Sequence, residues 1–429
     1  MSWEGMNKER RALLVFALYL GSASSLTPTD KLFLWRTPAA FGGDHAATHV
    51  CARQDEPVHL SRYCGDGTVF PSLGSRTQAK LAAHRGQLLV NGAEARAHTR
   101  VGFGDVLTLQ VPPPAPMSPG EVLRVERLFH ELTEARPAGT RLQVLYEDHD
   151  FAVVNKPPGI HSTSWAGTQR REYGRTELCL SDVLPLLLTP PPAGAGDPVP
   201  LPSPLPAHRL DARVAGVIAV AKTRRALAGL SHLFASRAVT KVYRAIVAGE
   251  VRQSAYACED AACTVFEVGI ETGNEAGDDA TFQPRSALRI EQLVDNDKLA
   301  ITELRVLSVT KCGVHGVLTT VDLRPLTGRR HQLRTACSQC CGVPIIGDDL
   351  YHDDANTVRT ALGLPLLAPP VRRKAGLFLQ ALELAFPHPV TGNPLVVTAP
   401  EMERFEKLRT RAASGAVWTD AEWVAWRAL

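Results

Sequence analysis

The chain lacks several features that would assign it to a specialised class of protein. None of its apolar runs approaches the roughly 20 residues that a helix needs to cross a bilayer. Its 47 basic and 44 acidic residues leave a net charge of only +3, so any nucleic-acid site must be a local basic patch. Aromatic residues make up only 6%, which disfavours the aromatic-rich cleft of an enzyme that acts on free sugars.

The nine cysteines do not form a regular disulfide framework. In a chain of this length, an odd and irregular set of cysteines indicates reduced thiols in a reducing compartment. Cys337, Cys340 and Cys341 are clustered, and Cys258 and Cys263 form a looser pair. Because no second half with histidine spacing accompanies them, buried thiols are favoured over a zinc site and no metal is predicted.

The chain is long enough for two or three domains and at least one large core. Weak periodicity, proline-rich stretches and returning strand patterns place the boundaries. The predicted parts are a poorly ordered leader at 1–70, a small domain at 72–111, a linker at 112–138, a large domain at 140–410 with a proline-rich insertion at 189–206 and an irregular insertion at 251–296, and a tail at 411–429.

The leader itself resembles a targeting segment. Basic residues at 8–11 precede an apolar stretch at 12–20 and small residues at 21–24. This order favours a cleavable address over an amphipathic helix or a plain tail. The destination is open between an organelle, either plastid or mitochondrion, and the cytoplasm.

Strand and helix patterns in the large domain mix without strict alternation. The stretches 142–146, 151–155, 214–221, 241–247, 302–310 and 316–323 have strand patterns, and 224–236 has helical spacing. This mixture predicts an α+β fold with a mixed, mainly antiparallel central sheet and flanking helices. The small domain before it is predicted to be α/β, with an Asn91-Gly92 hairpin turn.

The most informative stretch is 208–211, where Arg209 and Asp211 stand just before the apolar strand pattern. A charge beside a low-dielectric core is costly unless it is paired, so Asp211 either closes a structural turn or is held ionised for chemistry. A shielded carboxylate can attack a sugar carbon or remove a neighbouring proton. No second carboxylate stands in an equally marked context, which favours a reaction without water in which the leaving group is recaptured.

Cationic and aromatic residues elsewhere suit the same chemistry. Arg329 and Arg334 lie in a turn-helix pattern, and a guanidinium near Asp211 would lower the pKa of that carboxylate. Tyr243, next to Lys241 in the strand pattern, is suited to stack an aromatic base while cations hold phosphates. Taken singly, each of these residues is more often a turn, core or solvated position.

The order of the motifs resembles the RluA-type pseudouridine synthases, which convert uridine in structured RNA to its C-glycoside isomer. The resemblance spans about 142–400, and several motifs in one order are far more specific than any single motif. The segments that carry it are 155–159, 208–211 with Gly216, 241–243, 327–334, 344–348 with Tyr351, and 379–381 with 386–389.

The resemblance implies a role for each matching residue. Asp211 corresponds to the catalytic carboxylate, Tyr243 to the tyrosine that stacks on the base and assists proton removal, and Arg334 to the arginine that pairs with the carboxylate. Arg209 corresponds to a residue that helps to extrude the target nucleotide, and Lys156 to a structural or RNA-facing lysine. The other residues expected to contact RNA are His208, Lys241, Arg329, His331 and Gln332.

The implied reaction is base extrusion, glycosidic cleavage assisted by Asp211, rotation of the uracil and reattachment through carbon. The resemblance implies a monomer that acts on rRNA or tRNA without a metal or organic cofactor. The segment 75–111 also resembles a small RNA-binding domain named after a ribosomal small-subunit protein, with any other small α/β subdomain as the alternative.

The sequence departs from the family pattern near these motifs. Val214 and Ala215 stand where the family usually has Thr and Ser, and Ala336 and Gln380 replace two usual histidines. The lost hydroxyls could brace the Asp211 loop or touch RNA. These departures keep open a second hypothesis, a catalytically weak RNA-binding protein that retains the fold.

Overall fold

The computed structural model describes most of the predicted domains. It covers residues 35, 46–51, 57–65, 69–70, 76–110, 118–163, 178–191, 200–251, 256–258, 263–268, 287–294, 297–313, 315–367 and 376–415. The proposed targeting segment lies outside these residues. Within the described part of the chain, no helix is both long and apolar enough to cross a membrane.

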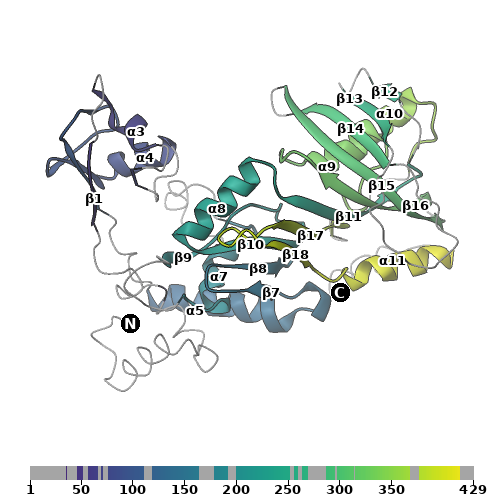
Figure 1. Cartoon of the computed structure of the whole chain (residues 1–429). Helices are drawn as coiled ribbons and strands as arrows, with labels where there is room; N and C mark the ends of the chain where they lie inside the picture. The colour runs from purple at the N-terminus through teal and green to yellow at the C-terminus, as the bar shows by residue number, and fades with distance from the viewer. Residues whose placement is uncertain are drawn as a thin grey trace.

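The N-terminal domain is a small sheet beside two short helices (Figure 1). Its main sheet has the order β1-β6-β3-β4, and β2 pairs with β5 beside it. Asn91 and Gly92 turn the chain between β3 and β4 with positive φ angles, as the expected hairpin requires. The elements are β1 (Ala46–Val50), β2 (Val58–His59), α3 (Leu60–Tyr63), α4 (Arg76–His84), β3 (Leu88–Val90), β4 (Ala93–Glu94), β5 (Arg100–Val101) and β6 (Val106–Gln110).

This domain starts earlier than the expected boundary at residue 72. The strand β1 pairs with β6 along all five of its residues, and Cys51 and Leu60 are buried in the same core as Leu107. Strands of two to five residues carry too little periodicity to be distinguished from a disordered leader. The described residues 46–51, 57–65 and 69–70 of the expected leader therefore belong to the domain.

The second part of the expected linker is a helix. Helix α5 (Pro119–His130) begins with a capping box, in which Ser118 accepts from the Glu121 N–H and the Glu121 carboxylate accepts from the Ser118 N–H. The π-helical turn η5 (Glu131–Ala135) follows it, and Val125 and Leu132 are buried against helix α7 (Leu180–Leu187). The burial of this apolar face, together with the cap, explains why the segment is folded.

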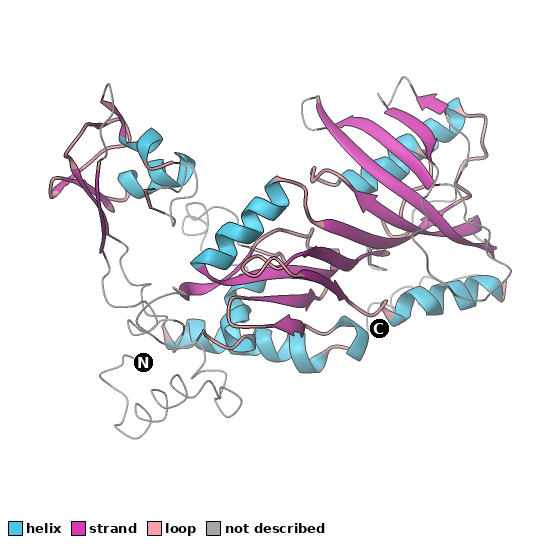
Figure 2. Ribbon diagram, in the orientation of Figure 1, coloured by secondary structure: helices cyan, strands magenta, loops and turns pink. Residues whose placement is uncertain are grey.

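The large domain is built on one long sheet of 12 described strands (Figure 2). The order is β12-β13-β14-β15-β16-β11-β17-β10-β8-β7, with β18 beside β17 and β9 beside β10. Strands β10 and β17 run parallel, and every other described pairing in this sheet is antiparallel. The expected fold class, mixed with a mainly antiparallel sheet and flanking helices, is confirmed.

The strand bounds follow the apolar patterns of the sequence. The strands are β7 (Gln143–Glu147), β8 (Phe151–Lys156), β9 (Pro200–Pro206), β10 (Ala215–Thr223), β11 (Thr240–Ala248), β12 (Tyr256–Cys258), β13 (Cys263–Val268), β14 (Ala287–Val294), β15 (Lys298–Cys312), β16 (Gly316–Pro325), β17 (Leu379–Pro387) and β18 (Pro394–Thr398). The remaining helices are the 3-10 turn η6 (Ala138–Thr140), α8 (Arg224–Ala235), α9 (Gln332–Thr335), the π-helical turn η8 (Ala336–Cys340), α10 (His352–Ala361) and α11 (Glu403–Ala413).

Two stretches expected as insertions contribute strands. The proline-rich stretch ends in β9, which pairs with β10 at the side of the sheet, a position where the missing N–H groups of proline are tolerated. The irregular stretch contains β12, β13 and β14, of which β14 pairs with β15 over seven residues.

The central strands are buried on both faces. In β10, Val217 and Ala219 belong to one core, and Ile218 and Val220 belong to a second core shared with α7. Successive side chains of a strand point to opposite faces, so a strand between two layers has a continuous apolar run. This explains the run that follows Asp211 in the sequence.

Gly216 allows β10 and β17 to approach at the centre of the sheet. It pairs with Ala381 in the parallel ladder, and its φ is +122°. A Cβ at this position would lie 1.9 Å from the Ala381 carbonyl oxygen, so only glycine fits. The loop that carries Asp211 thereby enters the sheet at a fixed place.

Candidate active site

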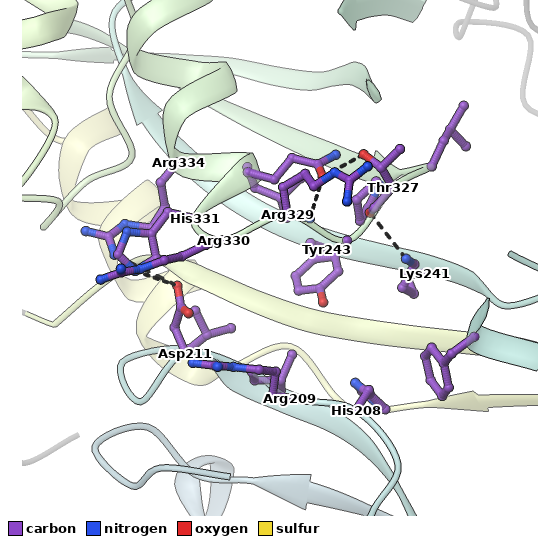
Figure 3. Close-up of a pocket in the computed structure, with 18 of the residues that line it drawn as sticks. His208, Arg209, Asp211, Lys241, Tyr243, Thr327, Arg329, Arg330, His331 and Arg334 are labelled. Atoms are coloured by element: carbon purple, nitrogen blue, oxygen red, sulfur yellow. Dashed lines mark hydrogen bonds and ion pairs between the residues drawn. The ribbon is translucent and has the colours of Figure 1, made fainter. Parts of the chain in front are cut away.

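A pocket of about 640 Å³ lies beside the central strands of the large domain, at the end where Asp211 precedes β10. Its lining includes the loop before β10, the start of β11, the end of β16 and the helix α9 (Figure 3). Nine of the ten expected site residues line this pocket, and Lys156 does not. A volume in this range is typical of sites that bind a small molecule or a single nucleotide.

Asp211 lies in the loop that leads into β10. Its carboxylate is 26% exposed, with the Oδ2 atom 3.6 Å from His331 Nε2 and 3.9 Å from Arg334 Nη1. The loop is held on its N-terminal side by Ser162, whose hydroxyl contacts both the N–H and the carbonyl of Leu210. The structure thus brings the carboxylate to the pocket and next to two nitrogen-bearing side chains.

Arg334 has a closer partner than the expected one. Its guanidinium donates to both carboxylate oxygens of Asp348, at 2.6 and 2.7 Å, and both side chains are almost fully buried. Burial disfavours the charged guanidinium, but the Asp348 hydrogen bonds and charge outweigh it and raise the pKa of Arg334. Arg334 therefore presents a fixed positive charge to Asp211 at a longer distance.

His331 lines the pocket, and its side chain lies next to Asp211. Its backbone is left-handed with φ +52°, a rare conformation for this residue that concentrates at functional sites. The Nδ1 atom lies 2.8 Å from the Tyr351 hydroxyl, while Nε2 faces Asp211. Burial lowers the pKa of His331, although the charge of Asp211 acts in the opposite direction.

Tyr243 reaches the pocket from strand β11. A register shift between Val242 and Tyr243 interrupts the pairing with β17, and such bulges redirect side chains near active sites. In Figure 3 the Tyr243 ring points into the pocket between Asp211 and Lys241. Burial, assisted by the charge of Asp211, raises the pKa of the phenol, so its hydroxyl stays protonated at neutral pH.

Lys156 is a buried structural lysine, so the prediction that it faces RNA is wrong. It is fully buried, and its ammonium donates to the carbonyls of Pro157, Ile160 and Ala212 at 2.9 to 3.3 Å. Burial lowers its pKa to about 7. The hydrogen bond to the Ala212 carbonyl fixes the backbone of the Asp211 loop from the buried side.

His208 and Gln332 line the pocket but hold the protein backbone. His208 Nε2 accepts the Ala219 N–H at 3.0 Å, and burial lowers its pKa to about 3, so it supplies no positive charge to RNA. The buried Gln332 amide bonds Thr327 and the N–H of Arg329 through its oxygen, at 2.7 and 3.0 Å. Its nitrogen donates to β15, so Gln332 positions the loop before α9.

The pocket walls are strongly basic. Among the described residues that line it, Asp211 is the single acidic side chain. The basic lining residues other than histidine are Arg209, Arg237, Lys241, Arg329, Arg330 and Arg334. Such a local concentration of cations attracts a phosphodiester backbone and satisfies the expectation of a local patch on a nearly neutral chain.

The departures from the family pattern lie mostly in buried positions. Val214 lines the pocket yet is only 3% exposed, and Ala215 is equally buried. Ala336 is fully buried outside the pocket lining. The Gln380 amide bonds the Pro400 carbonyl and the Met402 N–H at 2.8 Å, so it fastens the segment before α11.

Three residues of the site were given no role by sequence reasoning. They are Asp348 and Tyr351, which contact Arg334 and His331, and Arg213, which bonds Asp349. The sequence does carry a signal for Asp348, because an acidic residue that comes directly after an apolar run, here 343–346 and Gly347, needs a partner if it is buried. Sequence alone does not indicate which arginine supplies it.

The family model and the relatives that match this chain are RNA pseudouridine synthases. The family model described as RNA pseudouridylate synthase matches residues 150–339. The chain is 28% identical to ribosomal large subunit pseudouridine synthase C of Vibrio vulnificus, over 76% of this chain and 84% of that protein. It is 30% identical to ribosomal large subunit pseudouridine synthase D of Xanthomonas campestris, over 67% of this chain and 75% of that protein. A human structure, RNA pseudouridylate synthase domain containing 4, shows 23% identity and a TM-score of 0.43 over 70% of this chain and 100% of its own.

Proposed function

Because the chain belongs to the RluA-type family of RNA pseudouridine synthases, which are isomerases, we propose that it isomerises uridine in the RNA of the large ribosomal subunit, with Asp211 as the catalytic carboxylate. Two of the similar proteins are named as synthases of that subunit, which favours rRNA over tRNA. A monomeric state is proposed from the family resemblance.

The observation that carries the assignment of the site is the position of Asp211. It is the single carboxylate among the described lining residues of a basic pocket, and it faces His331 and Arg334. A polyanionic strand is attracted by the walls, while the fixed cation of Arg334 lies opposite the Asp211 carboxylate. The same set does not suit hydrolysis, because the described pocket lining holds no second carboxylate to activate water, and Asp348 is buried against Arg334.

The reaction needs only rearrangement within the nucleotide. The target uridine leaves the RNA stack and enters the pocket. Arg209, at the edge of the pocket, fills the position in the RNA stack that the uridine has left. Asp211 assists cleavage of the bond between C1′ and N1 of uracil. The freed uracil rotates and forms the bond between C1′ and C5, after which C5 loses its proton and N1 gains one. No atom is added or removed.

Tyr243 is proposed to stack on the uracil and to relay its proton. Because the phenol stays protonated, it accepts the C5 proton only as it passes its own hydroxyl proton to water, from which N1 takes up a proton. We expect Tyr243→Phe to lower kcat by about 10²- to 10⁴-fold, the usual contribution of a positioned proton-transfer group. The Kd for RNA should change less than about threefold, because the ring is retained.

Single-turnover kinetics and filter binding on one rRNA fragment separate the two effects of Tyr243→Phe. A matched variant, Tyr63→Phe in the N-terminal domain, should leave the rate unchanged. An unchanged rate for Tyr243→Phe would remove Tyr243 from proton transfer, though not from stacking.

The substrate proposal is tested with unmodified RNA. Purified protein is incubated with transcripts of the large-subunit rRNA and with a pool of unmodified tRNAs, and pseudouridines are mapped by chemical labelling. We expect one or a few rRNA sites to react and the tRNA pool to remain unmodified. Modification confined to tRNA would contradict the rRNA proposal, and no modification of either would contradict the activity.

A further inference from the structure

Arg213 connects the Asp211 loop to a distant turn of the large domain. It lies two residues after Asp211, and its side chain is 21% exposed. One terminal nitrogen bonds the Asp349 carboxylate and the other donates to the Gly347 carbonyl, each at 2.5 Å. The bonded groups are 134 and 136 residues away in sequence, so this is a tertiary connection.

The turn that Arg213 reaches also holds the arginine of the active site. Asp348, between the two partners of Arg213, receives both hydrogen bonds from Arg334. Three consecutive residues, 347–349, therefore bind two arginines. Arg213 comes from the Asp211 loop, and Arg334 comes from helix α9. This shared turn sets the separation between Asp211 and Arg334.

The turn itself is rigid where these contacts are made. Gly347 has φ +80°, and a Cβ there would lie 1.8 Å from the Gly376 carbonyl oxygen. The N–H of Asp348 is bonded to the Ile345 carbonyl, and the Asp348 carboxylate also accepts the Leu350 N–H. Because both arginines are bonded to one rigid turn, the position of Arg213 is fixed relative to that of Arg334.

The Asp211 loop needs such a connection because its neighbours cannot provide one. Ala212, Val214 and Ala215, which stand beside Arg213 between Asp211 and the start of strand β10, have no side-chain donor or acceptor. The ion pairs of Asp211 itself with His331 and Arg334 are long, at 3.6 and 3.9 Å. The side-chain hydrogen bonds of residues 210–213 to the rest of the described chain come from Ser162 to Leu210, from Lys156 to the Ala212 carbonyl and from Arg213. Of these hydrogen bonds, those of Arg213 alone reach the turn that binds Arg334.

We propose that Arg213 is a positioning residue for the isomerisation, fixing the Asp211 carboxylate opposite His331 and Arg334 through its bonds to Asp349 and Gly347. The proposal rests on the proposed function, because it assumes that Asp211 performs the chemistry. Arg213 is absent from the pocket lining, so it is not expected to touch the nucleotide.

The kinetic test uses four variants. Arg213→Gln removes the charge and one of the two connections, and we expect kcat to fall about 10- to 100-fold while the KM for RNA changes less than about twofold. A displacement of about 1 Å at a catalytic group costs rate on this scale. Asp349→Asn should also lower kcat, with little change in the KM for RNA. Arg213→Lys keeps the charge but cannot bond both partners as the guanidinium does, so it should lie between wild type and Arg213→Gln.

Arg225→Gln is the matched control. Arg225 makes a bidentate pair with Asp150, 75 residues away and outside the pocket lining, at 2.7 and 2.8 Å. Its replacement breaks a comparable tertiary ion pair, so thermal unfolding should respond to it at least as strongly as to Arg213→Gln, with kcat unchanged. An equal loss of kcat in both variants would overturn the proposal, because the effect would then follow from stability alone.

A second readout reports the position of Asp211 without any turnover. The pKa of His331 is measured by NMR in the free protein, where the charges of Asp211, Asp348, Arg330 and Arg334 act on it and the Tyr351 hydroxyl contacts its ring. The Asp211 charge raises that pKa, so a displaced carboxylate lowers it. We expect Arg213→Gln to lower the pKa of His331 in the direction expected for Asp211→Asn, and Arg225→Gln to leave it unchanged.

The sign of this shift is decisive. Removal of the positive charge of Arg213, with no movement of Asp211, would raise the pKa of His331 and would overturn the proposal. Wild-type protein that fails to form pseudouridine would overturn the proposed function instead. The NMR titration would still report whether Arg213 positions Asp211.

Discussion

Asp211→Asn should leave no measurable pseudouridine formation, a loss of at least about 10⁴-fold in kcat. Asparagine has the same shape but carries neither the negative charge nor the nucleophilic oxygen on which the reaction depends. The fold should survive, because the carboxylate is 26% exposed and its two ion-pair contacts are longer than 3.5 Å. Pseudouridine formation is measured on an rRNA fragment in single turnover, and unfolding is followed by circular dichroism.

Two comparisons make the Asp211→Asn result specific. Asp353→Asn removes a carboxylate that is fully exposed at the start of α10, and should retain wild-type activity. RNA binding by Asp211→Asn should also stay close to wild type, because the basic walls are intact. Turnover within tenfold of wild type would remove Asp211 from the chemistry.

The second large effect is expected for Asp348→Asn. This substitution leaves the Arg334 guanidinium buried without its carboxylate, and the loss of one partner from a buried ion pair costs about 3 to 5 kcal/mol in the free energy of unfolding. The same change frees Arg334 from its position beside Asp211, so kcat falls as well. Urea unfolding at constant pH, together with the single-turnover assay, measures both losses.

Glu291→Gln provides the comparison for Asp348→Asn. Glu291 pairs with Arg289 on β14, where both side chains are about one third exposed, and such surface pairs contribute about 0 to 1 kcal/mol. The contrast between the two variants isolates burial as the cause. A cost below about 1 kcal/mol for Asp348→Asn would show that Arg334 finds another partner.

The sequence was sufficient to predict which residues meet at the proposed catalytic centre, but not the partners that hold them in place. Asp211, Tyr243 and Arg334 stand in motifs whose order is informative, and the structure places all three on one pocket. Their local context gives residue type and spacing, which suffices to propose roles. The bonds of Arg334 to Asp348 and of Arg213 to Asp349 depend on tertiary packing, which no local pattern records.

The elements that were missed have physical reasons of the same kind. Helix α5 was assigned to a linker because prolines precede it, yet Ser118 and Glu121 form the capping-box pattern that marks a helix start. Strand β9 was missed because it is rich in proline, and its pairing depends on a place at the side of the sheet. The resemblance left Lys156 open between a structural and an RNA-facing role, and the three carbonyls that bind its ammonium come from tertiary packing that the adjacent prolines do not indicate.

The contact between Gly216 and Ala381 limits how this enzyme can diversify. Backbone atoms at the centre of the sheet determine how deep the proposed catalytic carboxylate lies, and no side-chain substitution adjusts that depth without separating two strands. Arg237 and Arg330 are exposed residues of the pocket lining, and their substitution does not separate these strands. A new choice of RNA partner is therefore accessible by changes at the entrance, while the chemistry beneath it remains the same.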